Sequence, residues 1–91
     1  MLLGATGCKP TLQVNSTQLT IGVGQAEKIQ VMDEDAYATV ASRPTDIVAK
    51  AEKTTTRNVF VVMGLSAGRS MIYLEAEGFN PRSVDVLVTS P

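Results

Sequence analysis

Polar and apolar residues alternate one by one along most of this sequence, and this period of two constrains the fold more than any other feature. The segment Lys28–Val31 is polar, apolar, polar, apolar, and Ser83–Val88 repeats the pattern with a valine at every second position. Successive side chains of an extended strand point to opposite faces, so such a segment buries one face and exposes the other. The alternation therefore predicts β-strands that each cover one side of an apolar core.

Glycine, proline and polar residues interrupt the alternation at short intervals, as at Gly22–Gln25, Gly64–Gly68 and Gly78–Pro81. About seven short strands separated by such turns are typical of an antiparallel β-sandwich. The expected strand segments are Thr11–Asn15, Gln18–Ile21, Lys28–Val31, Ala36–Ala41, Asp46–Lys53, Val59–Met63, Met71–Ala76 and Ser83–Val88.

Two of these segments call for comment. Val59–Met63 is the most hydrophobic run and is β-branched or aromatic nearly throughout, so we expect a central strand with Val61 in the interior. Asp46–Lys53 also suits a short helix, because alanine, lysine and glutamate are good helix formers. We favour a strand with Ile47, Ala49 and Ala51 facing inward, because its neighbours are all β and isolated short helices are marginal.

The composition fits a single folded domain without a charged partner. The chain has 91 residues, of which 44% are hydrophobic and 19% charged, which argues against disorder. Its net charge is −1, and its 8 basic residues are scattered along the sequence. Nucleic acid requires a basic stripe and anionic lipid a polybasic segment, so neither is expected as a partner.

The residue inventory also excludes most catalytic chemistry. There is no histidine and a single cysteine, Cys8, so no Ser–His–Asp or Cys–His pair can form, and a zinc site is nearly excluded. The three adjacent acids Asp33–Asp35 cannot all point at one calcium ion and are interpreted as a solvated turn. Glu75 and Glu77 share a strand face with no cleft implied. We therefore expect no enzyme activity, no cofactor and no metal.

The start of the sequence carries a different signal. Ala5–Cys8 resembles the lipobox of bacterial lipoproteins, in which small residues lead directly to a cysteine. The resemblance implies that Cys8 is lipidated and that the preceding residues are removed. We interpret residues 1–10 as a signal remnant and tether, and residues 11–91 as the folded domain. The alternative is a frayed terminus with a free thiol.

Glycine bends carry a resemblance to a known family. Val62–Gly68, followed by Ile72 and Leu74, resembles the signature of group 2 bacterial immunoglobulin-like domains, and so do Leu19–Gln25 and Pro44–Ala49. The chain lacks the tryptophan that this family often carries in its middle strand. The resemblance implies an immunoglobulin-like sandwich and an extracytoplasmic location.

A second resemblance runs through the C-terminal half. Gly64 to Gly68, Glu75–Gly78 and Val84–Val88 are similar, in this order, to the N-terminal domain of pilus-assembly secretins. A secretin continues into further domains, so only the sandwich fold and the extracytoplasmic address are carried over.

These observations favour a non-enzymatic structural or adhesive module of the cell envelope, such as a small lipoprotein accessory to a pilus or secretion system. A protein partner or a homo-oligomer is expected, with a membrane reached only through lipid on Cys8. The alternative is a ligand-binding or inhibitory domain that acts through loops at the sandwich end. The candidate contact loop is Thr54, Thr55, Thr56 and Arg57, for which a simple solvated loop is the other interpretation.

Overall fold

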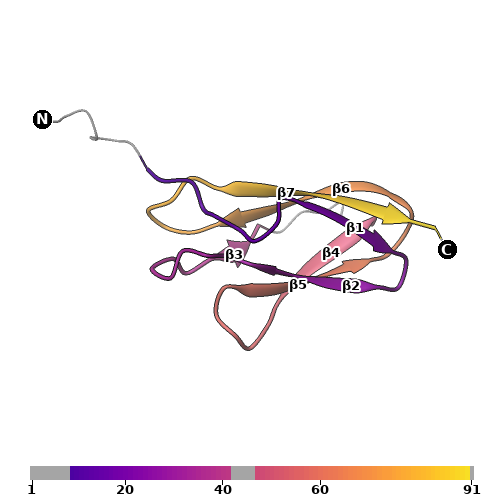
Figure 1. Ribbon diagram of the computed structural model, residues 1–91, viewed down its shortest axis with the longest axis horizontal. Helices are drawn as coiled ribbons and strands as arrows, with labels where there is room; N and C mark the ends of the chain where they lie inside the picture. The colour runs from indigo at the N-terminus through magenta and orange to yellow at the C-terminus, as the bar shows by residue number, and fades with distance from the viewer. Residues whose placement is uncertain (1–8, 42–46, 91) are drawn as a thin grey trace, which may run out of the picture.

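The computed structural model describes residues 9–41 and 47–90, which fold into seven strands in two sheets (Figure 1). The strands are β1 (Gln18–Gly22), β2 (Ala26–Gln30), β3 (Thr39–Val40), β4 (Ala49–Lys53), β5 (Val59–Gly64), β6 (Gly68–Glu75) and β7 (Arg82–Thr89). No helix occurs among these residues, and hence none long and apolar enough to cross a membrane.

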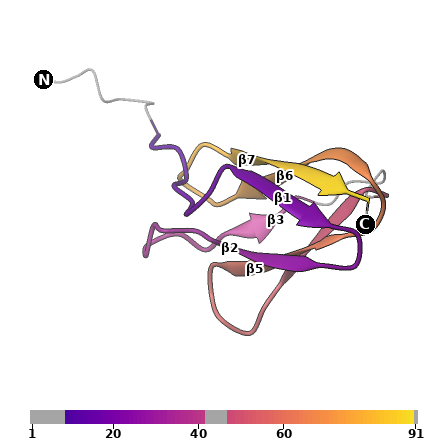
Figure 2. The ribbon, with the colours of Figure 1, turned by 45° about the vertical axis from the view of Figure 1, so that its right-hand side comes forward.

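The two sheets face each other as layers, which Figure 2 separates clearly. One sheet has the order β1-β7-β6-β3 and the other the order β2-β5-β4. Among the seven strands, all pairings are antiparallel except that of β1 with β7, which are parallel. The predicted all-β sandwich is therefore confirmed, with one parallel pair at the edge of the larger sheet.

The core lies between the sheets and follows the alternation in the sequence. Every second residue of β7, from Val84 to Val88, is buried, and so are Ile72 and Leu74 on β6. On β5 the phase differs from the expectation: Phe60 and Val62 are buried, whereas Val61 is only partly buried. A run without polar residues cannot reveal its own phase, and the facing sheet decides which residues it buries.

The segment before β1 forms only isolated bridges where a strand was predicted. Thr11 bridges Asn80 beside β7, and Val14 bridges Val31 at the end of β2, so the chain passes from one sheet to the other within a few residues. Leu12 is nevertheless fully buried at this crossing. The predicted strand Thr11–Asn15 therefore does not form a continuous ladder, although Leu12 is part of the core.

The predicted strand Ala36–Ala41 is likewise shortened to Thr39–Val40. Ala36 and Ala38 are buried as an alternating strand would have them, but their backbone groups bind the side chain of Asn58 instead of another strand. A side chain that takes the place of a strand partner is invisible to periodicity.

The ambiguous stretch is a strand over Ala49–Lys53, as favoured, and pairs antiparallel with β5. Ala49 is buried, but Ile47 lies outside the strand with 72% of its surface exposed, so its predicted inward position is wrong. Asp46 lies outside the described residues, and so do Cys8 and the lipobox-like segment.

Candidate functional site

The end of the sandwich opposite the β1–β2 turn is organised by one buried polar residue, Asn58. It is 5% exposed and adopts a positive φ of 66°, which asparagine tolerates better than most residues. Its Oδ1 accepts a hydrogen bond from the Ala38 N–H at 3.1 Å, and its Nδ2 donates to the carbonyls of Ala36 at 2.9 Å and Asp33 at 3.3 Å. The loop after β4 is thereby fastened to the loop after β2.

Arg57 and Tyr37 lie next to this anchor and face outward. The Arg57 guanidinium lies 4.7 Å from the centre of the Tyr37 ring and donates from Nη2 to the Glu34 carbonyl at 2.9 Å. Tyr37 is 71% exposed although its ring is held by the arginine. A preordered aromatic ring beside a cation is a surface that can stack on a flat apolar or sugar-like partner.

The threonines of the predicted contact loop differ in what they offer. Thr54 Oγ1 accepts from the Thr56 N–H at 3.1 Å and donates to the Val59 carbonyl at 2.8 Å, so its hydroxyl maintains the loop. Thr55 and Thr56 are exposed. Of the four predicted residues, Thr55, Thr56 and Arg57 are therefore exposed and Thr54 is half-buried, and their role as a contact loop stays a prediction.

The acidic turn Asp33–Asp35 lines a shallow hollow of about 470 Å³ at the same end, together with Pro10, Met32 and Phe79. Asp33 Oδ2 accepts a hydrogen bond from the Gln13 N–H at 2.7 Å, so this carboxylate has a structural role. Among residues 9–41 and 47–90, no three potential metal-ligating side chains come together. The turn fastens the N-terminal segment to the loop.

At the β1 edge of the larger sheet, most of the backbone groups that could pair with another strand are already hydrogen-bonded. The hydrogen bonds to β7 begin at the Thr17 carbonyl and end at the Val23 N–H. In a parallel pair only every second residue of a strand bonds to its partner, so the N–H and C=O groups of Gln18, Thr20 and Gly22 point away from β7. A hydrogen bond from Ser16 Oγ covers the Gln18 carbonyl at 2.7 Å.

At the other end of β1, Gln25 covers both outward groups of Gly22. Its Oε1 accepts the Gly22 N–H at 2.9 Å, and its N–H donates to the Gly22 carbonyl at 3.0 Å. Only Thr20 keeps both backbone groups directed to the open edge. Such capping protects an edge against pairing with another chain.

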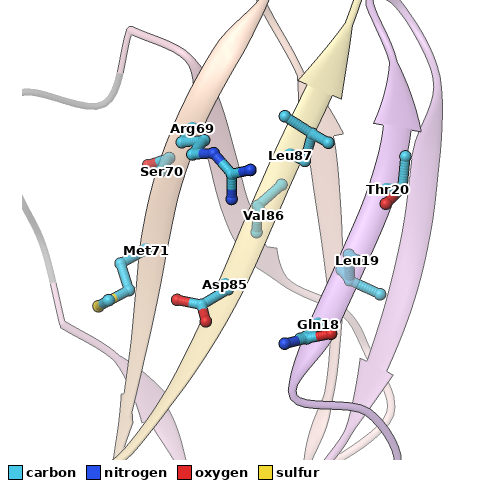
Figure 3. A pocket seen from close by; sticks show the side chains of 9 residues that line it. All are labelled: Gln18, Leu19, Thr20, Arg69, Ser70, Met71, Asp85, Val86 and Leu87. Atoms are coloured by element: carbon cyan, nitrogen blue, oxygen red, sulfur yellow. The ribbon is translucent and has the colours of Figure 1, made fainter.

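The outer face of the same sheet is open instead. A shallow hollow of about 540 Å³ lies across β1, β7 and β6 (Figure 3). It is lined by Gln18, Leu19, Thr20, Arg69, Ser70, Met71, Asp85, Val86 and Leu87. It combines the opposite charges of Arg69 and Asp85 with the exposed side chain of Met71 and the half-buried side chain of Leu87.

Sequence reasoning missed Asn58, Tyr37 and this outer face as parts of candidate sites. Asn58 carried one detectable signal, its position just before the most hydrophobic strand, where asparagine is typical of a turn. The outer face was missed because its residues come from three strands, whose order and register the sequence does not give.

No protein-family model matches the chain, and no curated protein sequence matches it significantly. Among solved structures it is similar to domains 4 and 5 of the S-layer protein SbsC, with a TM-score of 0.68 and 20% identity over 90% of this chain and 53% of that chain. Domains 5–6 of SbsC match with a TM-score of 0.69 and 20% identity over 90% and 44%. A titin I27 domain mutant matches with a TM-score of 0.53 and 9% identity over 88% and 90%.

The chain thus spans about half the length of the S-layer fragments it resembles, and likeness at these identities concerns the fold. The predicted likeness to secretins and to a lipobox stays a prediction. The two-sheet architecture and these neighbours together identify the chain as an immunoglobulin-like β-sandwich.

Proposed function

We propose that the chain is a non-enzymatic structural module of the bacterial cell envelope that carries tension along its long axis. The parallel pairing of β1 with β7 is the observation that carries this proposal. The described chain enters beside the start of β1 and leaves after β7 at the opposite end of the sandwich (Figure 1). Likeness in fold to S-layer protein domains supports an extracytoplasmic setting.

The parallel arrangement determines how a pull on the two ends is resisted. Opposite pulls slide β1 along β7, so the ladder from Thr17 O···Asp85 N at 2.9 Å to Val23 N···Thr89 O at 3.1 Å is strained all at once. Strands peeled apart from one end would lose their hydrogen bonds one at a time. The protein should therefore resist end-to-end tension more strongly than its modest size suggests.

Single-molecule force spectroscopy with handles on both sides of the domain tests this. Val23→Pro removes the Val23–Thr89 hydrogen bond but suits the turn, because Gly24 has a φ of 84° and proline is favoured at the preceding position of a type II turn. We expect a lower unfolding force, with the free energy of unfolding changed by less than about 1 kcal/mol.

Thr20→Pro is the matched control, because the Thr20 N–H points to the free edge and proline is tolerated there. We expect its unfolding force to equal that of the unsubstituted protein. Equal forces for all three proteins would contradict the proposal.

The finer form of the proposal is a small lipoprotein, anchored through lipid on Cys8, that serves a pilus or secretion system. It rests on the lipobox-like sequence Ala5–Cys8. Mass spectrometry of the protein extracted from its native membrane should show a diacylated Cys8 at the N-terminus. Detection of an unmodified, soluble chain that retains Met1 would contradict the lipoprotein proposal but not the structural role.

A second candidate function is ligand binding through the sandwich end, favoured by the exposed Tyr37 ring under Arg57. In that case, Tyr37→Ala and Arg57→Ala should abolish capture of a partner from envelope extract. Because both side chains are exposed, each change should alter the free energy of unfolding by less than about 1 kcal/mol. Thr55→Ala is the control for an exposed loop position. Capture that survives both main variants would reject this function.

A further inference from the structure

Four side chains on the outer face of the larger sheet lie at the corners of a rectangle, two on β6 and two on β7. Arg69 on β6 lies opposite Leu87 on β7, and Met71 lies opposite Asp85 two residues along each strand. The charged residues therefore occupy one diagonal and the apolar residues the other, as Figure 3 shows.

The charges on this rectangle have no ion-pair partners among residues 9–41 and 47–90. Arg69 and Asp85 are both exposed, and the one ion pair among the described residues joins Lys50 and Glu52 on β4. Met71 is 41% exposed beside them. Two unpaired opposite charges flanking exposed apolar surface are complementary to a copy of themselves.

We propose that this face binds a second copy of the same chain in a two-fold symmetric dimer. We place the two-fold axis in the contact plane, along the Met71–Leu87 diagonal. Rotation by 180° about this axis lays the rectangle of the second copy face to face on that of the first. Arg69 then faces the partner's Asp85, and Asp85 faces the partner's Arg69. Met71 and Leu87 pack on their own counterparts. A two-fold contact requires such a self-complementary patch.

The resulting packing is a known arrangement of sheets. Strands lie about 4.8 Å apart and alternate residues along a strand about 6.8 Å apart, so the diagonal makes an angle of roughly 35° with the strands. Rotation about this diagonal doubles the angle, and the strands of the two copies therefore cross at roughly 70°. This is closer to the orthogonal class of sheet packing than to the aligned class. The capped edge of β1 further directs a second copy to the face of the sheet rather than to its edge.

The size of the patch limits its affinity. Three strands offer less than the roughly 800 Å² per partner of a standard interface, so the dimer belongs to the weak class. We expect a dissociation constant on the order of 0.1 mM. The inference concerns a surface that the proposed tension-bearing role does not use, and either can fail without the other.

Sedimentation equilibrium between about 10 µM and about 2 mM tests the proposal, in a Cys8→Ser background that removes disulfide-linked dimers. The mass should rise from the 9.7 kDa of the monomer toward twice that value and stop there. In nuclear magnetic resonance spectra of the same Cys8→Ser protein, the backbone chemical shifts of Thr20, Ser70 and Leu87 should change with protein concentration. A monomer at every concentration, or growth beyond a dimer, overturns it.

Charge reversal tests the predicted contacts. Arg69→Asp and Asp85→Arg should each raise the dissociation constant at least about tenfold, because symmetry places the new like-charge contact in the dimer twice. The double variant exchanges the two charges and should return the dissociation constant to within about threefold.

Lys28→Asp and Glu27→Arg are the matched controls, because they change the net charge identically from exposed positions on β2 of the other sheet. They should leave association unchanged. Single reversals without effect, or a double variant that fails to recover, overturn the proposed geometry.

Discussion

Replacing Asn58 with alanine is expected to lower the free energy of unfolding by about 3–5 kcal/mol, the largest effect of any prediction made for this protein. The substitution leaves the Ala38 N–H and the Ala36 carbonyl buried without their partners at 3.1 and 2.9 Å. Each buried unsatisfied group costs about 1–3 kcal/mol. Alanine also tolerates the φ of 66° less well than asparagine. Urea unfolding at 25 °C measures the difference.

Two further variants separate the causes. Asn58→Gly removes the same hydrogen bonds but accepts the positive φ, so it should recover only about 1 kcal/mol of the loss. Asn15→Ala removes a comparable side-chain contact, Asn15 Oδ1 to the Gln30 N–H at 3.0 Å, at an exposed position where water can replace it. It should cost less than about 1 kcal/mol. If Asn58→Ala were as mild as this control, Asn58 would not be the anchor of the sandwich end.

Replacing Gly64 with alanine is expected to lower the free energy of unfolding by about 3 kcal/mol, because the other sheet leaves no room for a side chain there. A Cβ at Gly64 would lie 2.6 Å from the Gly22 carbonyl oxygen and 2.9 Å from Val88 Cγ1. Backbone hydrogen bonds to Gly24 and Gln25, both at 2.9 Å, hold Gly64 in place. The clash can be relieved only by moving one sheet away from the other.

Gly22→Ala is the matched control, because it adds the same methyl group to the residue of the other sheet that Gly64 contacts. It would meet only the Gln25 side chain, whose nearest atom lies at 2.8 Å and can swing into solvent. The expected cost is below about 1 kcal/mol in the same urea experiment. Similar losses for the two variants would mean that the close approach between the sheets is not what requires glycine at Gly64.

The alternation of side chains was sufficient to predict the strands whose partners lie on one side only. Val84, Val86 and Val88 are buried as predicted, because a strand that faces a core on one side must alternate. The same logic failed in Val59–Met63, where every side chain is apolar and the facing sheet decides that Phe60 rather than Val61 is buried.

The candidate sites depended on contacts between residues far apart in the sequence. Arg57 was predicted as part of a contact loop, but its stacking on Tyr37 requires two loops from different strands to meet. The outer face of the larger sheet requires the register of β6 on β7, which places Arg69 diagonal to Asp85. Neither arrangement has a local signature.

The sequence by itself determined the class of fold, because a period of two and frequent turn residues leave few ways to bury aliphatic side chains in a chain of this length. It also showed that these 91 residues contain no histidine. Only the tertiary structure decided that β1 runs parallel to β7, that Asn58 joins two loops and that a shallow hollow lies across the outer face of the larger sheet. Strand order and register arise from packing between distant segments, and the spacing of residues along the chain carries little information about them.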